Sequence, residues 1–163
     1  MTNQAVLIDN WKGDLMDKEV FVTLKGLQIS EQTQPGVVEI VALGEYYEKN
    51  DKKYIIYDEV VEGMEGKIKN IIKLSPTCME VTKKGLTNAH MVFEENKKNL
   101  TVYNTPFGAF SLGILATGID IDETDDAMNV RVNYELDMNY EHVADCTISL
   151  GIQSKNQGGL SLS

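Results

Sequence analysis

The sequence predicts an all-β fold, an antiparallel up-and-down meander of about ten strands that closes into a barrel. Apolar and polar residues alternate with a period of two through most of the chain, as in strands with one buried face. Most of the stretches between them are about two to five residues long, and all are short, which suits hairpins and excludes parallel crossovers. A twisted sheet of this many strands curls, and closure removes its exposed edges.

The first six predicted strands end at residues that favour turns. Pro35-Gly36, Asn50-Asp51 and Ser75-Pro76 are typical turn pairs between them. The strands span Val20–Ser30, Val37–Glu48, Lys53–Glu62, Lys67–Leu74, Thr77–Lys83 and Thr87–Glu95.

The last four predicted strands include the clearest alternation, in which the even positions of Val130–Tyr140 are apolar. The strand before it is apolar on both faces and is interrupted by Gly108, Gly113 and Gly118. Glycine inside a strand often marks a bulge or bend, so we expect a corner of the barrel there. The four strands span Leu100–Thr105, Phe107–Ile121, Val130–Tyr140 and His142–Ile152.

The barrel domain is expected to cover residues 18–153 of the 163. Residues 1–17, which include Trp11, are predicted to pack on the barrel as a short helix or an extra edge strand. Residues 154–163 lack apolar bulk and are predicted to form a flexible tail.

The charge balance argues against nucleic acid as a partner. The formal net charge is −10, and Arg131 is the only Arg, whereas phosphate binding depends on Lys and Arg. No stretch approaches the ~20 apolar residues of a membrane span, and the N-terminus has no positively charged region of a signal peptide. We therefore expect a cytoplasmic protein that binds neither nucleic acid nor membrane.

The cysteines and histidines do not form a recognisable metal or cofactor motif. Cys78 and Cys146 are predicted to be reduced core thiols, with one long-range disulfide as the alternative. His90 is expected to face solvent, and neither it nor His142 has a second ligand at metal spacing. We expect no metal, no cofactor, and a monomer or weak dimer.

Four segments have a characteristic order and spacing. They are Tyr54-x-x-Tyr57-x-Glu59, Gly66-Lys67-Ile68-Lys69-x-Ile71-x-Lys73, Lys83-x-Gly85 and Tyr103-x-Thr105-Pro106-Phe107-Gly108. From about Val20 to Ile152 the chain resembles the YwiB-like family of bacterial proteins of unknown function. This resemblance implies a calycin-like (lipocalin-like) β-barrel and no particular activity. Lys83 stands where the family pattern has Arg, and Lys holds an anion less specifically.

Polar residues in phase with apolar faces are the candidate site. Lys83 continues the apolar face of its strand, and Asn70 shares a face with apolar neighbours. Either Glu59, in phase with Tyr57, or Asp58 faces inward with them. The candidate ligand-binding residues at the interior or mouth of the barrel are Tyr57, Glu59, Asn70, Lys83, Tyr103 and Thr105.

Three functions fit these residues. The first is a small-ligand-binding module that holds a partly apolar ligand in the barrel, gripped by this polar cluster. The second is a protein-interaction or regulatory domain, in which the barrel is filled by side chains and the cluster is a satisfied ion pair near its rim. An exposed apolar patch around Trp11 or the Phe107 strand would favour it. The third is an enzyme with Glu59 as general base and Lys83 or Tyr57 as its partner, although the sequence contains no catalytic motif.

Overall fold

The computed structural model describes residues 18–26 and 39–155, so the predicted N-terminal segment and most of the predicted tail lie outside it. Within these residues one strand forms for each predicted strand, and the ends that the structure describes differ by a few residues. The predicted end of the first strand at Ser30, the Pro35-Gly36 turn and the predicted start of the second strand at Val37 lie outside the described residues. The strands are β1 (Lys18–Lys25), β2 (Glu39–Lys49), β3 (Lys52–Val60), β4 (Lys67–Ser75), β5 (Cys78–Gly85), β6 (Ala89–Glu94), β7 (Lys98–Thr105), β8 (Gly108–Glu123), β9 (Ala127–Met138) and β10 (Glu141–Ser154).

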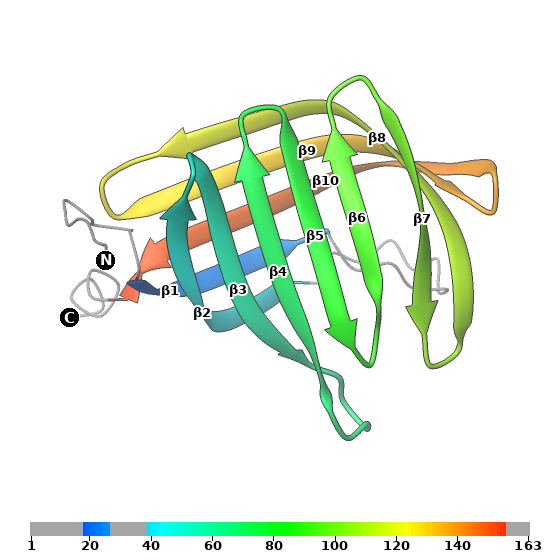
Figure 1. The fold of residues 1–163 in the computed structure, drawn as a ribbon, viewed down its shortest axis with the longest axis horizontal. Helices are drawn as coiled ribbons and strands as arrows, with labels where there is room; N and C mark the ends of the chain where they lie inside the picture. Colours follow the sequence, from blue (N-terminus) through cyan, green and yellow to red (C-terminus); the bar gives the residue numbers. More distant parts are fainter. Residues whose placement is uncertain (1–17, 27–38, 156–163) are drawn as a thin grey trace.

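All of these strands join one antiparallel sheet in the order β6-β5-β4-β3-β2-β1-β10-β9-β8-β7. β1 pairs with both β2 and β10, which brings the two ends of the meander together. In Figure 1, β3 to β7 lie in front, and β8, β9, β10 and β1 run across behind them. The predicted up-and-down meander is therefore confirmed, and it forms a nearly closed barrel.

The seam of the barrel lies between β6 and β7, where the pairing is less complete than between the other neighbouring strands. Two isolated bridges join these strands, Glu94 with Lys97 beside the turn and Asn88 with Asn104 farther along. Between these bridges the described residues form no continuous ladder. Both strands therefore keep an edge that closure was expected to remove.

The length of β8 accounts for the seam, because β8 has 16 residues and β7 has 8. Their pairing ends at Leu115, so the rest of β8 has no β7 partner. The β6–β7 turn forms hydrogen bonds with this unpaired edge of β8 instead. The Asn96 N–H donates to the Ala116 carbonyl (3.0 Å), and the Glu95 carboxylate accepts the Ile119 N–H (3.0 Å). These bonds hold the turn on β8.

The predicted irregularity in β8 is confirmed. Its pairing with β9 shifts register between Ala116 and Gly118, so Thr117 is the extra residue of a β-bulge. A bulge increases the local twist, which helps this long strand to bend around the barrel.

Two hairpin turns have a left-handed backbone at both central residues, which matches the twist of the flanking strands. Asn50 (φ 54°) and Asp51 (φ 65°) connect β2 to β3, as the sequence predicts. Asn139 (φ 50°) and Tyr140 (φ 73°) connect β9 to β10, so the predicted strand end at Tyr140 is wrong. The Asn139 N–H donates to the Ser111 carbonyl (2.7 Å), which holds this turn against β8.

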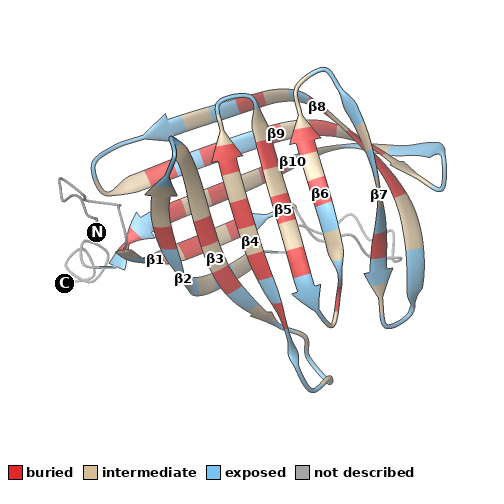
Figure 2. Ribbon diagram, in the orientation of Figure 1, coloured by how far each residue is buried: buried red, intermediate tan, exposed pale blue. Residues whose placement is uncertain are grey.

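The interior of the barrel is filled by side chains. Figure 2 shows buried residues alternating with more exposed ones along the strands. Ile72, Val132 and Ile148 come from separate parts of the wall and are each 0% exposed, so no water-sized space touches them. Phe93 and Tyr134 pack edge to face with ring centroids 5.0 Å apart. The centre of the barrel is therefore packed.

Candidate functional site

Three of the predicted site residues lie in one row across neighbouring strands. Tyr57 of β3 pairs with Asn70 of β4, which pairs with Lys83 of β5. Cross-strand partners project to the same face, and each of these side chains is at most 2% exposed. The prediction that Lys83 continues the buried face of its strand is confirmed.

Alternation along β3 sends Glu59 inward with Tyr57, and Asp58 outward. The Lys83 Nζ lies 3.2 Å from Glu59 Oε1 and donates to Asn70 Oδ1 at 2.8 Å. The Asn70 amide donates to the same Glu59 oxygen at 3.2 Å, which closes a network of three side chains. The sequence did not decide whether Asp58 or Glu59 faces inward, and the structure places Glu59 inward.

Burial and charge act together on the groups around Glu59. Burial lowers the pKa of Lys83, and the nearby Glu59 carboxylate opposes that change. Burial, helped by Glu59, raises the pKa of Tyr103 to about 12, and both act in the same direction on the pKa of Tyr57. The two phenols therefore lie within electrostatic range of this carboxylate. We call Tyr57, Glu59, Asn70, Lys83 and Tyr103 the Lys83 cluster.

The Lys83 cluster contains a buried hydroxyl without a partner. Tyr57 is 2% exposed, and its Oη makes no hydrogen bond with the described residues; Ser154 Oγ is the other buried side-chain atom of this kind. Leaving a buried hydroxyl unpaired costs about 1–3 kcal/mol. The Lys83 ammonium has three N–H groups, and two of them have acceptors among the described residues, on Glu59 and Asn70. The third N–H group is therefore available to a ligand.

Thr105 is not part of this cluster. Its hydroxyl donates to the Gly108 carbonyl (2.9 Å) and accepts the Phe107 N–H (3.0 Å). The Thr105-Pro106-Phe107-Gly108 segment is thus the β7–β8 turn, as its residues predict. The turn already uses the Thr105 hydroxyl, so we do not assign it to the site.

The Lys83 cluster lies toward one end of the barrel. Glu59, Lys83 and Tyr103 are each within two residues of the C-terminal end of their strand, beside the β3–β4, β5–β6 and β7–β8 turns. The Glu59 side chain is 12% exposed and that of Lys83 is 1% exposed. A ligand group would therefore reach Lys83 by passing Glu59.

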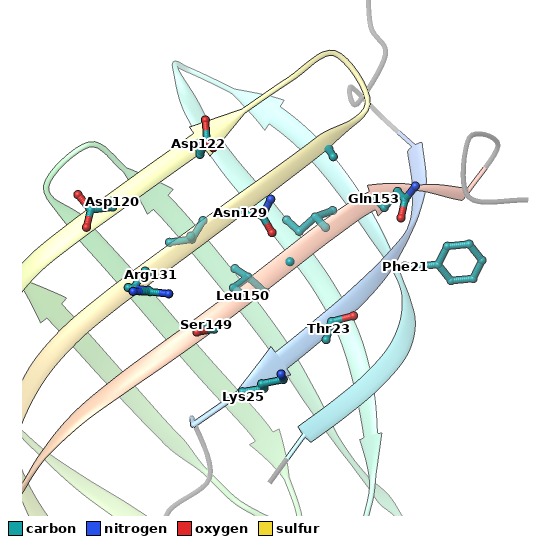
Figure 3. Close-up of a pocket in the computed structure, with 14 residues that line it drawn as sticks. Phe21, Thr23, Lys25, Asp120, Asp122, Asn129, Arg131, Ser149, Leu150 and Gln153 are labelled. Atoms are coloured by element: carbon teal, nitrogen blue, oxygen red, sulfur yellow. The ribbon is translucent and has the colours of Figure 1, made fainter. Parts of the chain in front are cut away.

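A second concave region, of about 730 Å³, lies on the outer face of β8, β9, β10 and β1 (Figure 3). We call it the outer hollow. Gly151 lies in its middle, between cross-strand partners Asn129 and Thr23, and Arg131 projects into it. Sequence reasoning missed it, because its residues come from distant segments and resemble the wet faces of ordinary strands.

A smaller hollow of about 400 Å³ lies over β7 and β8, lined in part by Leu100, Val102 and Tyr140. These side chains are 69%, 51% and 82% exposed, and Phe107 in the adjoining turn is 79% exposed. An apolar patch near the Phe107 strand is therefore present, while Trp11 lies outside the described residues.

The cysteines and histidines have ordinary surroundings. Cys78 and Cys146 are free, which excludes the alternative disulfide, and burial raises the pKa of both thiols. His90 is exposed, as predicted, and its Nε2 lies 3.0 Å from Glu80. Residues 18–26 and 39–155 contain no group of three His, Cys, Asp or Glu side chains placed to hold a metal ion. They also contain no helix with the length and apolar character to cross a membrane.

Comparison with known proteins gives the same fold and no activity. Residues 22–150 match the family described as "Domain of unknown function (DUF1934)". The uncharacterized beta-barrel protein YwiB of Bacillus subtilis is 27% identical over 137 residues, which cover 82% of this chain and 95% of that protein. The crystal structure of the ywiB protein from Bacillus subtilis superposes with a TM-score of 0.70 at 21% identity, covering 89% of this chain and 99% of that one.

Proposed function

The chain belongs to the DUF1934 family, and we propose that it is a small-ligand-binding module in which the Lys83 cluster holds one polar group of the ligand. The observation that carries this proposal is the Tyr57 hydroxyl, which is buried and has no hydrogen-bond partner among the described residues. Buried polar groups in folded proteins are nearly always hydrogen-bonded, so an unpaired one is a sign of a missing partner. A ligand oxygen beside Tyr57 and Lys83 supplies that partner to both donors.

The charges of the cluster define the kind of group that it accepts. Glu59 already neutralises Lys83 at 3.2 Å, so a second anion beside Lys83 is repelled by the Glu59 carboxylate. A neutral acceptor, such as an amide or ketone oxygen, takes the spare donors without that repulsion. The site therefore favours a neutral carbonyl over a carboxylate.

The packed centre limits how much of the ligand enters the barrel. Ile72 and Val81 form the next inward-facing pair beside Asn70 and Lys83, and both are 0% exposed. We infer that at most one small polar group passes Glu59, and that the rest of the ligand lies against the turns at this end. This narrows the expectation of a partly apolar ligand held in the barrel to a ligand that enters it with one group.

The test is a titration of nitrogen-15-labelled protein with small fragments, followed by nuclear magnetic resonance. N-methylacetamide and pyrrolidinone present a neutral carbonyl, whereas acetate presents a carboxylate. We expect the carbonyl fragments to shift the Asn70 and Lys83 amide signals at millimolar concentration, and acetate to shift them less.

Tyr57→Phe removes the hydroxyl that the proposal depends on, and we expect it to abolish these shifts. Tyr54→Phe is the matched control, because Tyr54 lies on the outer face of β3, stacked on Tyr47 with centroids 4.9 Å apart. The proposal fails if no carbonyl fragment shifts the Asn70 and Lys83 signals, or if Tyr57→Phe responds like the wild type.

A second candidate function is a protein-interaction domain, favoured by the packed barrel and by the exposed apolar side chains of β7. The smaller hollow is also lined by Lys98 and Asp137, so its rim carries both signs of charge. A second copy of the chain, related by a two-fold axis, complements such a surface with the same surface. Sedimentation velocity over a range of concentrations tests this. If the chain dimerises through this face, Leu100→Lys is expected to dissociate the dimer. A wild-type protein that is monomeric at every concentration would exclude this function.

A further inference from the structure

The outer hollow is a grid of polar side chains on four adjacent strands. Asp120, Arg131, Ser149 and Lys25 form one row of cross-strand partners from β8 to β1. The next row on the same face contains Asp122, Asn129, Gly151 and Thr23. Strands spaced about 4.8 Å apart make these rows about 14 Å across, which is the scale of a disaccharide.

The polar side chains of the hollow make no hydrogen bonds or ion pairs with the rest of the described protein. Elsewhere on the surface, described lysines and carboxylates pair repeatedly, as in Lys67 with Asp58 (3.0 Å) and Lys53 with Glu123 (3.5 Å). In the hollow, Arg131 has no ion pair within 4.0 Å among the described residues, although its cross-strand partner is Asp120. The hollow therefore presents donors and acceptors that no other part of the described chain uses.

The charges that line the hollow cancel. Lys25 and Arg131 contribute two positive charges, and Asp120 and Asp122 contribute two negative ones. Because the hollow has no net charge and the whole chain carries −10, we expect no electrostatic attraction of an anion. The two positive side chains of the hollow oppose the binding of a cation. What remains is a dense mixture of hydrogen-bond donors and acceptors, to which the Asn129 amide adds one of each kind.

Phe21 and Gly151 shape the hollow for a flat ligand. Phe21 stands at one rim in Figure 3 and is partly exposed, so its ring offers an apolar face beside the polar grid. A Cβ added at Gly151 meets the nearest atom, Asn129 Oδ1, at 3.4 Å, which is an ordinary contact. The absence of a side chain at Gly151 therefore deepens the hollow, although the backbone does not require glycine there.

We propose that the outer hollow is a binding site for a neutral, hydroxyl-rich ligand of the saccharide class. Each hydroxyl of a sugar both donates and accepts hydrogen bonds, which suits a lining that mixes donors and acceptors and has no net charge. The apolar C–H face of a pyranose packs on an aromatic ring such as Phe21. Amide and carboxylate side chains on the grid pair with adjacent hydroxyls, and Arg131 donates to two oxygens at once.

The test is a titration of nitrogen-15-labelled protein with maltose, cellobiose and chitobiose, with galacturonic acid and glucosamine as charged probes. We expect at least one neutral disaccharide to shift the Asn129, Arg131 and Gly151 amide signals. The charged sugars are expected to bind no more tightly than the neutral ones.

Gly151→Val fills the middle of the hollow with a residue that suits a strand, so the barrel is expected to fold and to lose saccharide binding. Arg131→Ala is a second variant that removes a donor without adding volume, and it is expected to weaken binding. Its control is Lys69→Ala, which removes an exposed cation from the outer face of β4.

Three results overturn the inference: no disaccharide shifts these signals, a charged sugar binds more tightly, or Gly151→Val binds like the wild type. The inference does not depend on the Lys83 cluster. Tyr57→Phe is expected to leave saccharide binding unchanged, so the failure of either site leaves the other one standing.

Discussion

Asp58 and Glu59 are adjacent on β3, and their ion pairs have similar lengths in opposite surroundings. Asp58 points outward, and its oxygen lies 3.0 Å from the Lys67 Nζ, with side chains 46% and 63% exposed. Glu59 points inward, 3.2 Å from the Lys83 Nζ, with side chains 12% and 1% exposed. The two pairs therefore separate the effect of distance from the effect of burial.

The comparison teaches that the energy of an ion pair depends on what remains when one partner is removed. Outside, water and salt solvate the remaining charge, so an exposed pair contributes about 0–1 kcal/mol. Inside, the remaining charge is largely shielded from water and has lost the charge of the removed partner, which costs about 3–5 kcal/mol. Asn70 adds a second reason, because it bonds to both members of the inner pair.

The largest expected effect follows from removing each cation in turn. Lys83→Met is expected to lower the free energy of unfolding by about 3–5 kcal/mol, because Glu59 is left in a largely buried site. Lys67→Met is expected to change it by less than about 1 kcal/mol. Equilibrium denaturation in urea measures both, and equal losses in the two variants would show that burial is not what distinguishes the pairs.

Alkaline pH tests the inner face by a different route. Burial raises the pKa values of Tyr57 and Tyr103 above the ordinary 10.0, in the case of Tyr103 to about 12. Above pH 10 the unfolded chain loses these protons while the native state keeps them, so stability falls as pH rises, by about 1.4 kcal/mol per unit for each such group. The lowered pKa of Lys83 acts in the opposite direction below pH 10.5.

Urea denaturation between pH 8 and about 11 measures this decline. Tyr103→Phe removes one of the responsible groups and is expected to make the decline shallower. An equally steep decline in Tyr103→Phe, or no decline in the wild type, would contradict the assignment of these phenols to the buried cluster.

Most of the fold was predictable from local pattern, because alternation and turn residues act over a few positions. The strand near Val130 and the turn at Asn50-Asp51 are of this kind. The seam between β6 and β7 was not, since it depends on the Glu95 and Asn96 turn bonding to β8 about 20 residues away.

The sequence predicted the candidate site except for the choice between two neighbouring carboxylates. Alternation placed Lys83 and Asn70 inward, but β3 is apolar on both faces, so the sequence could not decide between Asp58 and Glu59. The unpaired Tyr57 hydroxyl is a property of packing and has no sequence signal. The sequence did not predict the outer hollow. Its polar residues lie on the outward faces of four strands, and only the pairing register of those strands brings them side by side.

Double-mutant cycles measure the coupling energy within each ion pair, which is expected to be smaller than the loss in a single variant. For Lys83→Met and Glu59→Gln we expect a coupling energy of about 1–3 kcal/mol, because the two side chains share one buried network. For Lys67→Met and Asp58→Asn we expect at most about 0.5 kcal/mol. Additive losses at the inner pair would show that Lys83 and Glu59 do not depend on each other.

The smallest expected effect compares the two faces of β3 through its tyrosines. Tyr57→Phe removes an unpaired buried hydroxyl, so we expect the ligand-free protein to be unchanged or more stable by up to about 1 kcal/mol. Tyr54→Phe, on the outer face, is expected to change stability by less than about 0.5 kcal/mol. A loss above about 1 kcal/mol in Tyr57→Phe, measured by urea denaturation, would mean that the hydroxyl has a partner within the protein.

In the proposed function, the Lys83 cluster holds a polar group of a small ligand. A high-resolution crystal structure of protein purified from its native source tests this most directly, because a ligand that co-purifies is seen in place. We expect a ligand oxygen within hydrogen-bonding distance of Tyr57 Oη and Lys83 Nζ, with the rest of the molecule beside Glu59 and the adjoining turns. A Tyr57 hydroxyl bonded only to water or to another side chain, with no ligand at this end of the barrel, would contradict the claim.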